Sequence, residues 1–437
     1  MTRLRSARRT SRRRPALAVA VVTVVALTLA ACGPITAPPD NPVHPRAVST
    51  NPDDRTPHVL YGRFRAVLDR GDRVLIGGEF TTVKTYDRPT QHARQGLFAY
   101  DKATGAIDTK FLPALDRGGV RALAVSGDGQ LLIGGSFQRV GGHFSPGLAK
   151  LNPSTGAPNK AFRGGTDGWV LTMEARGNRL FVGGTFTRVD GANRSRLAAV
   201  DSTTGAVDTR FDVPVDQALR AYSLVNQLDA TSDGSRLVIT GNFTRVSGQP
   251  RTQVAVIDVG SAGASVSSWA TEGYRAGVCS STIDYYVKDV DISPDDRFFA
   301  VVTTGAWGGL STLCDTVARW ELGPTGAGQQ PTWADYTGGD SLSAVAITGS
   351  TLYAAGHQRW ANNEHPPYGD AKGPGAVDRP GIAAYDSATG DVLPWAIDRE
   401  RGLQVGTLTP TAQGLWIGSD SSRLGGEWHP RVSYLPL

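Results

Sequence analysis

Residues 179–205 read RLFVGGTFTRVDGANRSRLAAVDSTTG, and the parts of this stretch recur along the whole chain. An apolar run ends in Gly183-Gly184-Thr185-Phe186, a polar loop follows, and a second apolar run ends in Asp201-Ser202-Thr203-Thr204-Gly205. Short runs of apolar and β-branched residues bounded by Gly and Asp predict β-strands joined by turns. The Asp side chain can bond the turn backbone and Gly accepts a positive φ, so Asp-x-x-Thr-Gly predicts a tight turn.

Recurrence of the Gly-Gly-x-Phe string sets the number of repeats. It occurs at 77–80, 134–137 and 183–186, with a variant at Gly241-Asn242-Phe243 and weaker echoes around Gly305, Gly356 and Gly418. Consecutive anchor glycines lie 49 to 64 residues apart. Seven such repeats fill the chain from about residue 58 to its end, and a period of this size indicates a repeat architecture.

Most repeats share one internal order of four strands. The first is apolar, as at Val120–Val125 or Leu342–Ile347, and a tight turn leads to the second, which carries the anchor glycine. A longer loop leads to the third strand, which ends in the Asp-x-x-Thr-Gly turn. A short fourth strand ends in an aromatic residue: Phe111, Phe162, Phe211, Trp269, Trp333 or Trp395. The sequence therefore predicts an all-β, seven-bladed β-propeller of four-stranded antiparallel blades over residues 58–437.

Closure of the predicted ring involves both ends of this region. The last repeat stops soon after its third strand at 432–435, while His58-Val59-Leu60-Tyr61 precedes the first repeat without a partner. An unpaired sheet edge is a liability. We therefore expect this N-terminal strand to complete blade seven.

The repeat resembles the delta-sixty-type propeller repeat of secreted bacterial proteins. The C-terminal part is similar to actinobacterial members, through the segments beginning at Cys279, Cys314, Arg319, His357, Gly373 and Gly414. The resemblance covers about residues 60 to 437. It implies the architecture and no established activity.

The N-terminus resembles a bacterial lipoprotein signal. Seven arginines within residues 3–14 precede an uncharged apolar run over 15–31 that ends in Leu29-Ala30-Ala31-Cys32. We expect cleavage before Cys32, acylation of Cys32, palmitate included, and anchoring to the extracytoplasmic face of the cell membrane. The alternatives are an ordinary secretory signal or a single membrane helix, and the Sec and twin-arginine export routes both stay open. Residues 1–31 are thus assigned as signal peptide and the Pro-rich residues 32–57 as a disordered tether.

Charge argues against nucleic-acid binding. The net charge of +5 depends on the arginines of residues 1–31, which hold no acidic residue, and cleavage there leaves −2. The remainder lacks the basic footprint of a DNA- or RNA-binding protein.

Two of the three cysteines, Cys279 and Cys314, remain once Cys32 is assigned to lipid. Outside the cytoplasm such a pair is most simply a disulfide. A free pair or a metal-binding pair is the alternative.

Loop lengths indicate which face could bind a ligand. Turns between first and second strands are tight, whereas loops between second and third strands are long, and binding residues concentrate on long loops. The longest span 304–315 and 357–379. The candidate ligand-binding residues there are Trp307, His357, Trp360, Asn362, Asn363, Glu364 and His365. Aromatic faces and amides suit contact with a glycan or peptide, although the same residues suit a loop that packs on itself.

Catalytic and cofactor motifs are weak. Histidines are scattered over several repeats without metal-ligand spacing, so we expect neither metal nor cofactor. Glu364 with Asp370 or Asp340 could form the carboxylate pair of a glycan-cleaving enzyme. We expect a monomeric binding or scaffold module for an extracellular glycan, peptide or protein. The alternative is a hydrolase or lyase acting on envelope polysaccharide or another extracellular substrate.

Overall fold

The computed structural model describes residues 1–2 and 42–437, except residues 88, 276, 280–285, 368–369 and 403. The chain divides into two units, Met1–Pro34 and Ile35–Leu437, and the architecture below is that of the second. Cys32 and nearly all of the predicted signal peptide lie outside the described residues. The described residues form strands and no helix, in agreement with the all-β prediction.

Seven sheets share one meander order, in which the first, second and third strands pair as antiparallel neighbours. They are β2 (Arg63–Asp69), β3 (Arg73–Glu79) and β6 (Leu97–Asp101); β7 (Val120–Val125), β8 (Leu131–Gly135) and β11 (Leu148–Leu151); β12 (Val170–Arg176), β13 (Arg179–Gly184) and β16 (Leu197–Asp201); β18 (Val225–Ala230), β19 (Arg236–Gly241), β22 (Val254–Gly260) and β23 (Gly263–Val266); β24 (Val287–Ile292), β25 (Phe298–Thr303), β26 (Thr316–Glu321) and β27 (Trp333–Tyr336); β28 (Leu342–Ile347), β29 (Thr351–Gly356) and β32 (Ile382–Asp386); and β33 (Val405–Thr411), β34 (Gly414–Ser419) and β37 (Val432–Pro436).

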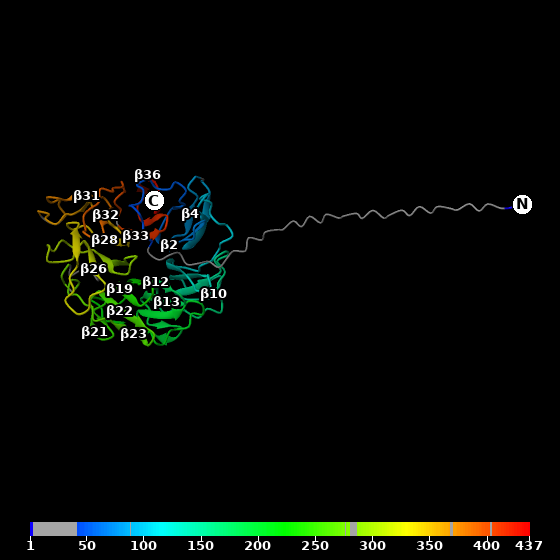
Figure 1. Cartoon of the computed structure of the whole chain (residues 1–437), viewed down its shortest axis with the longest axis horizontal. Coiled ribbons are helices and arrows are strands. Elements are labelled where there is room, and N and C mark those ends of the chain that lie inside the picture. The colour runs from blue at the N-terminus through cyan, green and yellow to red at the C-terminus, as the bar shows by residue number, and fades with distance from the viewer. Residues whose placement is uncertain (3–41, 88, 276, 280–285, 368–369, 403) are drawn as a thin grey trace. The chain divides into compact units, whose positions relative to one another are not determined.

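The first strands of these sheets face one another around a common centre. Each contacts the next in chain order, from β2 through β7, β12, β18, β24 and β28 to β33, and β33 contacts β2 again. Figure 1 shows this order within the unit as a progression of colour from blue through green and yellow to red. The apolar core lies in layers between neighbouring sheets, and one layer joins Phe64 of the first sheet to Trp416 and Tyr434 of the last.

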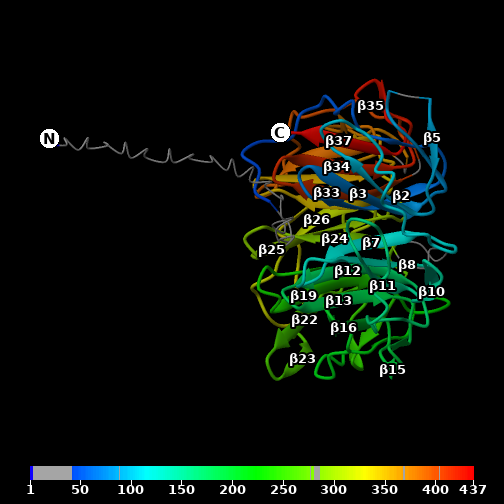
Figure 2. The same ribbon diagram turned by 90° about the vertical axis from the view of Figure 1, so that its right-hand side faces the viewer.

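Six smaller sheets arise mainly from the loops between second and third strands. They are β1 (His58–Val59) with β4 (Thr82–Lys84) and β5 (Gln91–Ala93); β9 (Arg139–Val140) with β10 (His143–Phe144); β14 (Arg188–Val189) with β15 (Ala192–Asn193); β17 (Val215–Asp216) with β20 (Arg245–Val246) and β21 (Gln249–Pro250); β30 (Trp360–Ala361) with β31 (Val377–Asp378); and β35 (Arg423–Leu424) with β36 (Glu427–Trp428). Figure 2 shows β5, β10 and β15 on the same side of the unit.

The predicted closing strand occupies a different place. His58 and Val59 pair with Lys84 and Val83 of β4, not with the last sheet. The same pairing recurs in the second repeat. There the segment before the first strand, β7, pairs with the small hairpin between the second and third strands, through a bridge between Leu115 and Val140. Residues 49–53 lie beside β37 instead, since the N–H groups of Ser49 and Asp53 donate to Pro436 and Tyr434 carbonyls over 2.7 and 2.8 Å.

The fourth strands are shorter than expected. Within the described residues, only the sheets that start with β18 and β24 contain four strands. In four others the fourth segment makes a single bridge, such as Tyr100 with Ile107. In the first sheet the Asp108 carboxylate accepts the N–H groups of Lys110 and Phe111. Such local side-chain bonds compete with the ladder and end the strand.

Part of the predicted tether is packed. His44 and Val48 are 2% exposed. The Val48 N–H donates to the Tyr353 hydroxyl over 2.9 Å, and Trp395 Nε1 donates to the Val48 carbonyl over 2.7 Å. The expected disordered tether therefore does not extend through residues 42–57, because these residues complete the core beside the last two sheets.

Candidate binding site in the central cavity

A β-bulge recurs near the start of all seven first strands. In β2 the register shifts between Phe64 and Ala66, and the other six strands shift at the equivalent pair. A bulge leaves one residue unpaired and re-aims its side chain. The seven bulged residues are Arg65, Arg121, Leu171, Asn226, Lys288, Ser343 and Gly406.

All seven bulged residues line one cavity of about 500 Å³. The remaining lining residues are their neighbours Arg63, Gln227, Thr304, Ser341, Leu342, Gln404 and Val405. Because every first strand contributes, the cavity lies at the centre, at the ends where these strands begin. Thr304 also opens the 304–315 loop, which places the cavity on the face predicted to bind a ligand.

The cavity wall carries positive charge. Its four cations are Arg63, Arg65, Arg121 and Lys288, and none of the described lining residues is Asp or Glu. Glu79 pairs with two of these cations, through a short contact to Arg121 and a 3.8 Å contact to Arg65. The Arg63 side chain is exposed and has no ion-pair or hydrogen-bond partner among the described residues. The wall can therefore attract an anion.

Polar groups of the wall are held in place by neighbouring strands. Asn226 Nδ2 donates to the Lys288 carbonyl over 2.7 Å. The Ser343 hydroxyl donates to the Val405 carbonyl over 2.8 Å and accepts the Val405 N–H over 3.1 Å. Each bond joins consecutive first strands, so the wall is preorganised before any ligand arrives.

Buried carboxylates further along the first strands also connect neighbouring sheets. Asp289 accepts the Val345 N–H over 2.9 Å, and Asp291 accepts the Ile347 N–H over 2.5 Å. Burial raises the pKa of Asp289 to about 7, and burial with the nearby Asp229 raises the pKa of Asp291. These groups bond backbone amides, which gives them a structural role.

An aromatic recess adjoins the central cavity through Arg121. It has a volume of about 520 Å³ and is lined by Tyr61, Glu79, Gln95, Trp169 and six further residues. The Tyr61 and Trp169 side chains are 73% and 51% exposed. The Arg121 guanidinium lies 5.6 Å from the Trp169 ring centroid. A ligand reaching from the cavity to this recess would meet both charge and an aromatic face.

The two long loops predicted to bind a ligand meet at β27. Trp307 packs edge-on against Tyr336, with ring centroids 5.7 Å apart. The Tyr336 carbonyl accepts the Asn363 N–H over 2.7 Å. Trp360 is half-buried, and the Arg359 guanidinium lies 4.2 Å from its ring centroid.

The burial of Asn363 argues against its predicted contact with a ligand. It is 0% exposed, its Nδ2 donates to the Thr337 and Ala371 carbonyls, and its Oδ1 accepts the Gly373 N–H. Its side-chain amide bonds Ala371 and Gly373 of the same loop and Thr337 outside it, so Asn363 holds this loop against the chain that follows β27.

The other residues of this set are more accessible. Asn362 and His365 are exposed, Glu364 and His357 are half-buried, and Glu364 lies 4.0 Å from the His365 ring nitrogen. The His357 N–H donates to the Ser341 carbonyl over 2.9 Å, which connects this loop to the cavity wall. Burial and the nearby Arg401 lower the pKa of His357.

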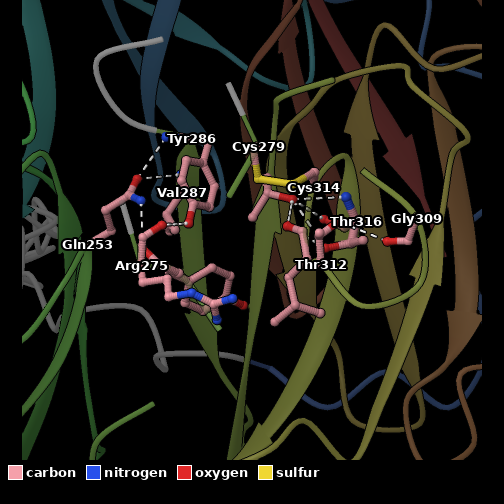
Figure 3. Close-up of a disulfide and its surroundings, with 12 residues drawn as sticks. Gln253, Arg275, Cys279, Tyr286, Val287, Gly309, Thr312, Cys314 and Thr316 are labelled. Carbon is pink, nitrogen blue, oxygen red and sulfur yellow. Dashed lines mark hydrogen bonds between the residues drawn. A yellow bond between two sulfur atoms is a disulfide. The ribbon is translucent and has the colours of Figure 1, made fainter. Parts of the chain in front are cut away.

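The predicted disulfide is present. Cys279 and Cys314 are bonded, with Cα atoms 5.4 Å apart (Figure 3). A Cβ at Gly305 would lie 2.8 Å from the Cys279 Cβ, which explains the glycine at this position. Gln253, also drawn in Figure 3, donates to the Tyr274 carbonyl and accepts the Tyr286 N–H, so it secures both ends of the segment that carries Cys279.

The carboxylates proposed for catalysis do not form an available pair. Asp340 is 1% exposed and bonds Arg359 and Arg401 over 2.8 to 3.0 Å. Asp370 is exposed and also bonds Arg359. Both carboxylate oxygens of Asp340 thus accept hydrogen bonds from guanidinium groups, and its burial keeps it away from a substrate.

The bulged residues are the functional feature that the sequence interpretation missed. A signal was available, because a polar residue follows the first apolar residue in most first strands, as in Val120-Arg121, Val287-Lys288 and Leu342-Ser343. Both faces of these strands are buried, so no alternation shows which side chain leaves the sheet.

Comparison with known proteins agrees with the fold. Residues 127–162 and 178–211 match a family model described as a domain of unknown function (DUF5122) β-propeller. The chain folds as a β-propeller. Two solved structures similar to this propeller are titled "Structure of U3-55K" and "Crystal structure of RRP9 WD40 repeats". Both are 13% identical, with TM-scores of 0.50 and 0.51, cover 89% and 88% of this chain, and are themselves covered over 100% and 98%. No curated protein matches it in sequence.

Among the described residues, the propeller contains no helix long and apolar enough to cross a membrane.

Proposed function

We propose that this chain is a lipid-anchored, extracytoplasmic binding or scaffold module whose propeller has seven blades, one for each sheet of three or four strands. The ligand is an anionic group, a carboxylate or sulfate, presented by an extracellular glycan, peptide or protein. The lipobox at Cys32 supports the anchor, and the order of the seven first strands around one centre supports the blade count.

The observation that carries the proposal is the ring of bulged residues. It gathers three cations, Arg65, Arg121 and Lys288, around one cavity and adds Arg63 at the same end. Hydrogen bonds from charged donors to an anion are stronger than neutral ones. Glu79 balances part of this charge, so an anion of low charge is favoured over a polyanion such as nucleic acid.

A hydrolase or lyase remains the second candidate, but the cavity favours binding. Glycan cleavage ordinarily needs two accessible carboxylates flanking the bond. The described cavity lining offers none, and the buried Asp289 and Asp291 accept backbone amides.

The ligand test uses glycan and peptide arrays that include acidic and neutral members of equal length. We expect acidic members to bind, and the Arg63→Gln/Lys288→Gln variant to bind them about 10-fold or more weakly, because charged hydrogen bonds contribute about 1.5–3 kcal/mol each. Arg188→Gln, on the exposed face of β14, is the control and should bind normally. Equal binding of acidic members by the cavity variant and the control would reject the cavity as an anion-binding site. Release of cleaved glycan would favour the hydrolase or lyase over a binding module.

The anchor is tested separately by Cys32→Ser. We expect loss of the lipid label and a shift from the detergent phase to the aqueous phase, because the acyl chains proposed on Cys32 supply the membrane affinity. An unchanged lipid label and detergent-phase fraction would contradict the lipoprotein assignment.

A further inference from the structure

A second group of potential ligand atoms lies away from the central cavity, where the N-terminal segment meets the last sheet. Carboxylate oxygens of Asp54 and Glu427 and a ring nitrogen of His429 all lie within 4.8 Å of one another. Glu427 lies in β36 and His429 follows that strand directly, and His429 Nε2 lies 3.1 Å from Glu427 Oε2. Asp54 comes from the opposite end of the chain.

The Asp54 carboxylate is uncommitted. The neighbouring Asp53 is bonded to Arg55 through its carboxylate, whereas Asp54 has no hydrogen-bond or ion-pair partner among the described residues. Two carboxylates this close repel each other unless a cation lies between them. A cation between these two carboxylates would also be within reach of His429, whose ring nitrogen lies within the same 4.8 Å.

His429 is held in an orientation that suits a ligand. It is 4% exposed, its Nδ1 lies 3.1 Å from the Thr56 hydroxyl, and its Nε2 lies 3.1 Å from Glu427 Oε2. Metal-ligating histidines usually have the second ring nitrogen fixed by such a hydrogen bond. If Thr56 donates to the Val432 carbonyl, over 3.4 Å, it accepts from Nδ1, and the Nε2 lone pair faces the carboxylate.

A second imidazole lies near this group. Burial, with contributions from Lys84 and His429, lowers the pKa of His58 to about 4, so this ring is neutral at neutral pH. His58 is 6% exposed, and its Nδ1 has no hydrogen-bond partner among the described residues.

We propose that Asp54, Glu427 and His429 form a divalent-metal site, suited to Zn²⁺, that fastens the N-terminal segment to the last sheet. One imidazole and two carboxylates match the mixed nitrogen and oxygen ligands of Zn²⁺, whereas Ca²⁺ prefers oxygen alone. Ligand bonds of about 2.0–2.2 Å in tetrahedral geometry place the ligand atoms of one ion about 3.3–3.6 Å apart, and the three ligand atoms here lie within 4.8 Å of one another.

The surrounding backbone shows what such an ion would stabilise. Residues 49–53 lie along β37, the Val59 N–H donates to the Pro430 carbonyl over 3.3 Å, and Pro52 packs against Gly425 in the turn between β35 and β36. An ion bound by Asp54 and by residues after β35 would join the two ends of the propeller. The sequence offered no metal spacing because the ligands come from these two ends.

The test measures Zn²⁺ binding by titration calorimetry with the full chain in detergent, after removal of metal with EDTA. We expect one Zn²⁺ per chain, and at least about 10-fold weaker binding for Asp54→Asn and for Glu427→Gln. Asp54 is exposed, so its change to Asn leaves the fold intact. The controls Asp72→Asn and Glu272→Gln change exposed carboxylates elsewhere and should bind Zn²⁺ normally.

Hydrogen exchange provides the second readout. Zn²⁺ should slow exchange in residues 53–59 and 427–432 of the unchanged protein and not of Asp54→Asn. Absence of binding, binding that Asp54→Asn leaves unchanged, or equal affinity for Ca²⁺ would overturn the metal site. Acidic ligands should still bind Asp54→Asn, so failure here is distinct from failure of the central cavity.

Discussion

Val48 offers a direct test of whether residues 42–57 pack against the last two sheets. It is 2% exposed and packs with residues of the last two sheets, whereas Val43 in the same segment is 70% exposed. Val48→Ala removes two buried carbon groups and leaves both backbone hydrogen bonds of Val48 in place. At about 0.8 kcal/mol for each buried CH₂, with a further contribution from the cavity left behind, we expect a loss of about 2 kcal/mol.

The assay is urea denaturation monitored by tryptophan fluorescence, with Val43→Ala as the matched control. The control should change the free energy of unfolding by no more than about 0.5 kcal/mol, as surface substitutions usually do. A lower urea midpoint for Val48→Ala alone would support the packing of residues 42–57 into the core. Equal midpoints for the two variants would mean that residues 42–57 are the loose tether that their proline content suggested.

Three further predictions concern the long-loop face. Replacing Cys279 and Cys314 together with Ser should destabilise the protein by about 3–4 kcal/mol for a loop of this length, and should raise hydrogen exchange mainly in residues 304–315; unchanged exchange would show that the disulfide does not restrain this loop. Burial and the charges of Asp340 and Asp370 raise the pKa of Asp315 to about 8, so the folded state keeps a proton that the unfolded chain loses. The stability that this proton contributes is complete below about pH 4 and is lost as the pH rises to about 8. Asp315→Asn should therefore weaken the pH dependence of the unfolding midpoint over this range. An unaltered pH dependence of the midpoint would contradict the assignment. Asn363→Ala should cost about 1–3 kcal/mol by leaving buried backbone groups unpaired, with increased proteolysis at 357–379; wild-type resistance would count against its structural role.

The repeats, turns and disulfide were accessible from sequence because each depends on local chemistry or simple pairing. The turn at Asp101 illustrates this: its carboxylate accepts the Thr104 N–H over 2.8 Å, and Gly105 has a φ of +68°. Both features require particular residues at fixed offsets, so they are visible in one repeat and confirmed by the next. Cys279 and Cys314 were the only cysteines left after the lipobox assignment.

Tertiary structure decided which N-terminal segment lies beside the last sheet, which residues line the cavity and where the two end segments of the propeller meet. His58 and Val59 and residues 49–53 are similar candidates for an edge strand, and only the register of the last sheet selects between them. Arg121 and Lys288 occur in strands buried on both faces, and a bulge sends each to the centre without any change in the apolar pattern. Such features depend on contacts between residues far apart in the chain, whose distance and orientation a local pattern cannot specify.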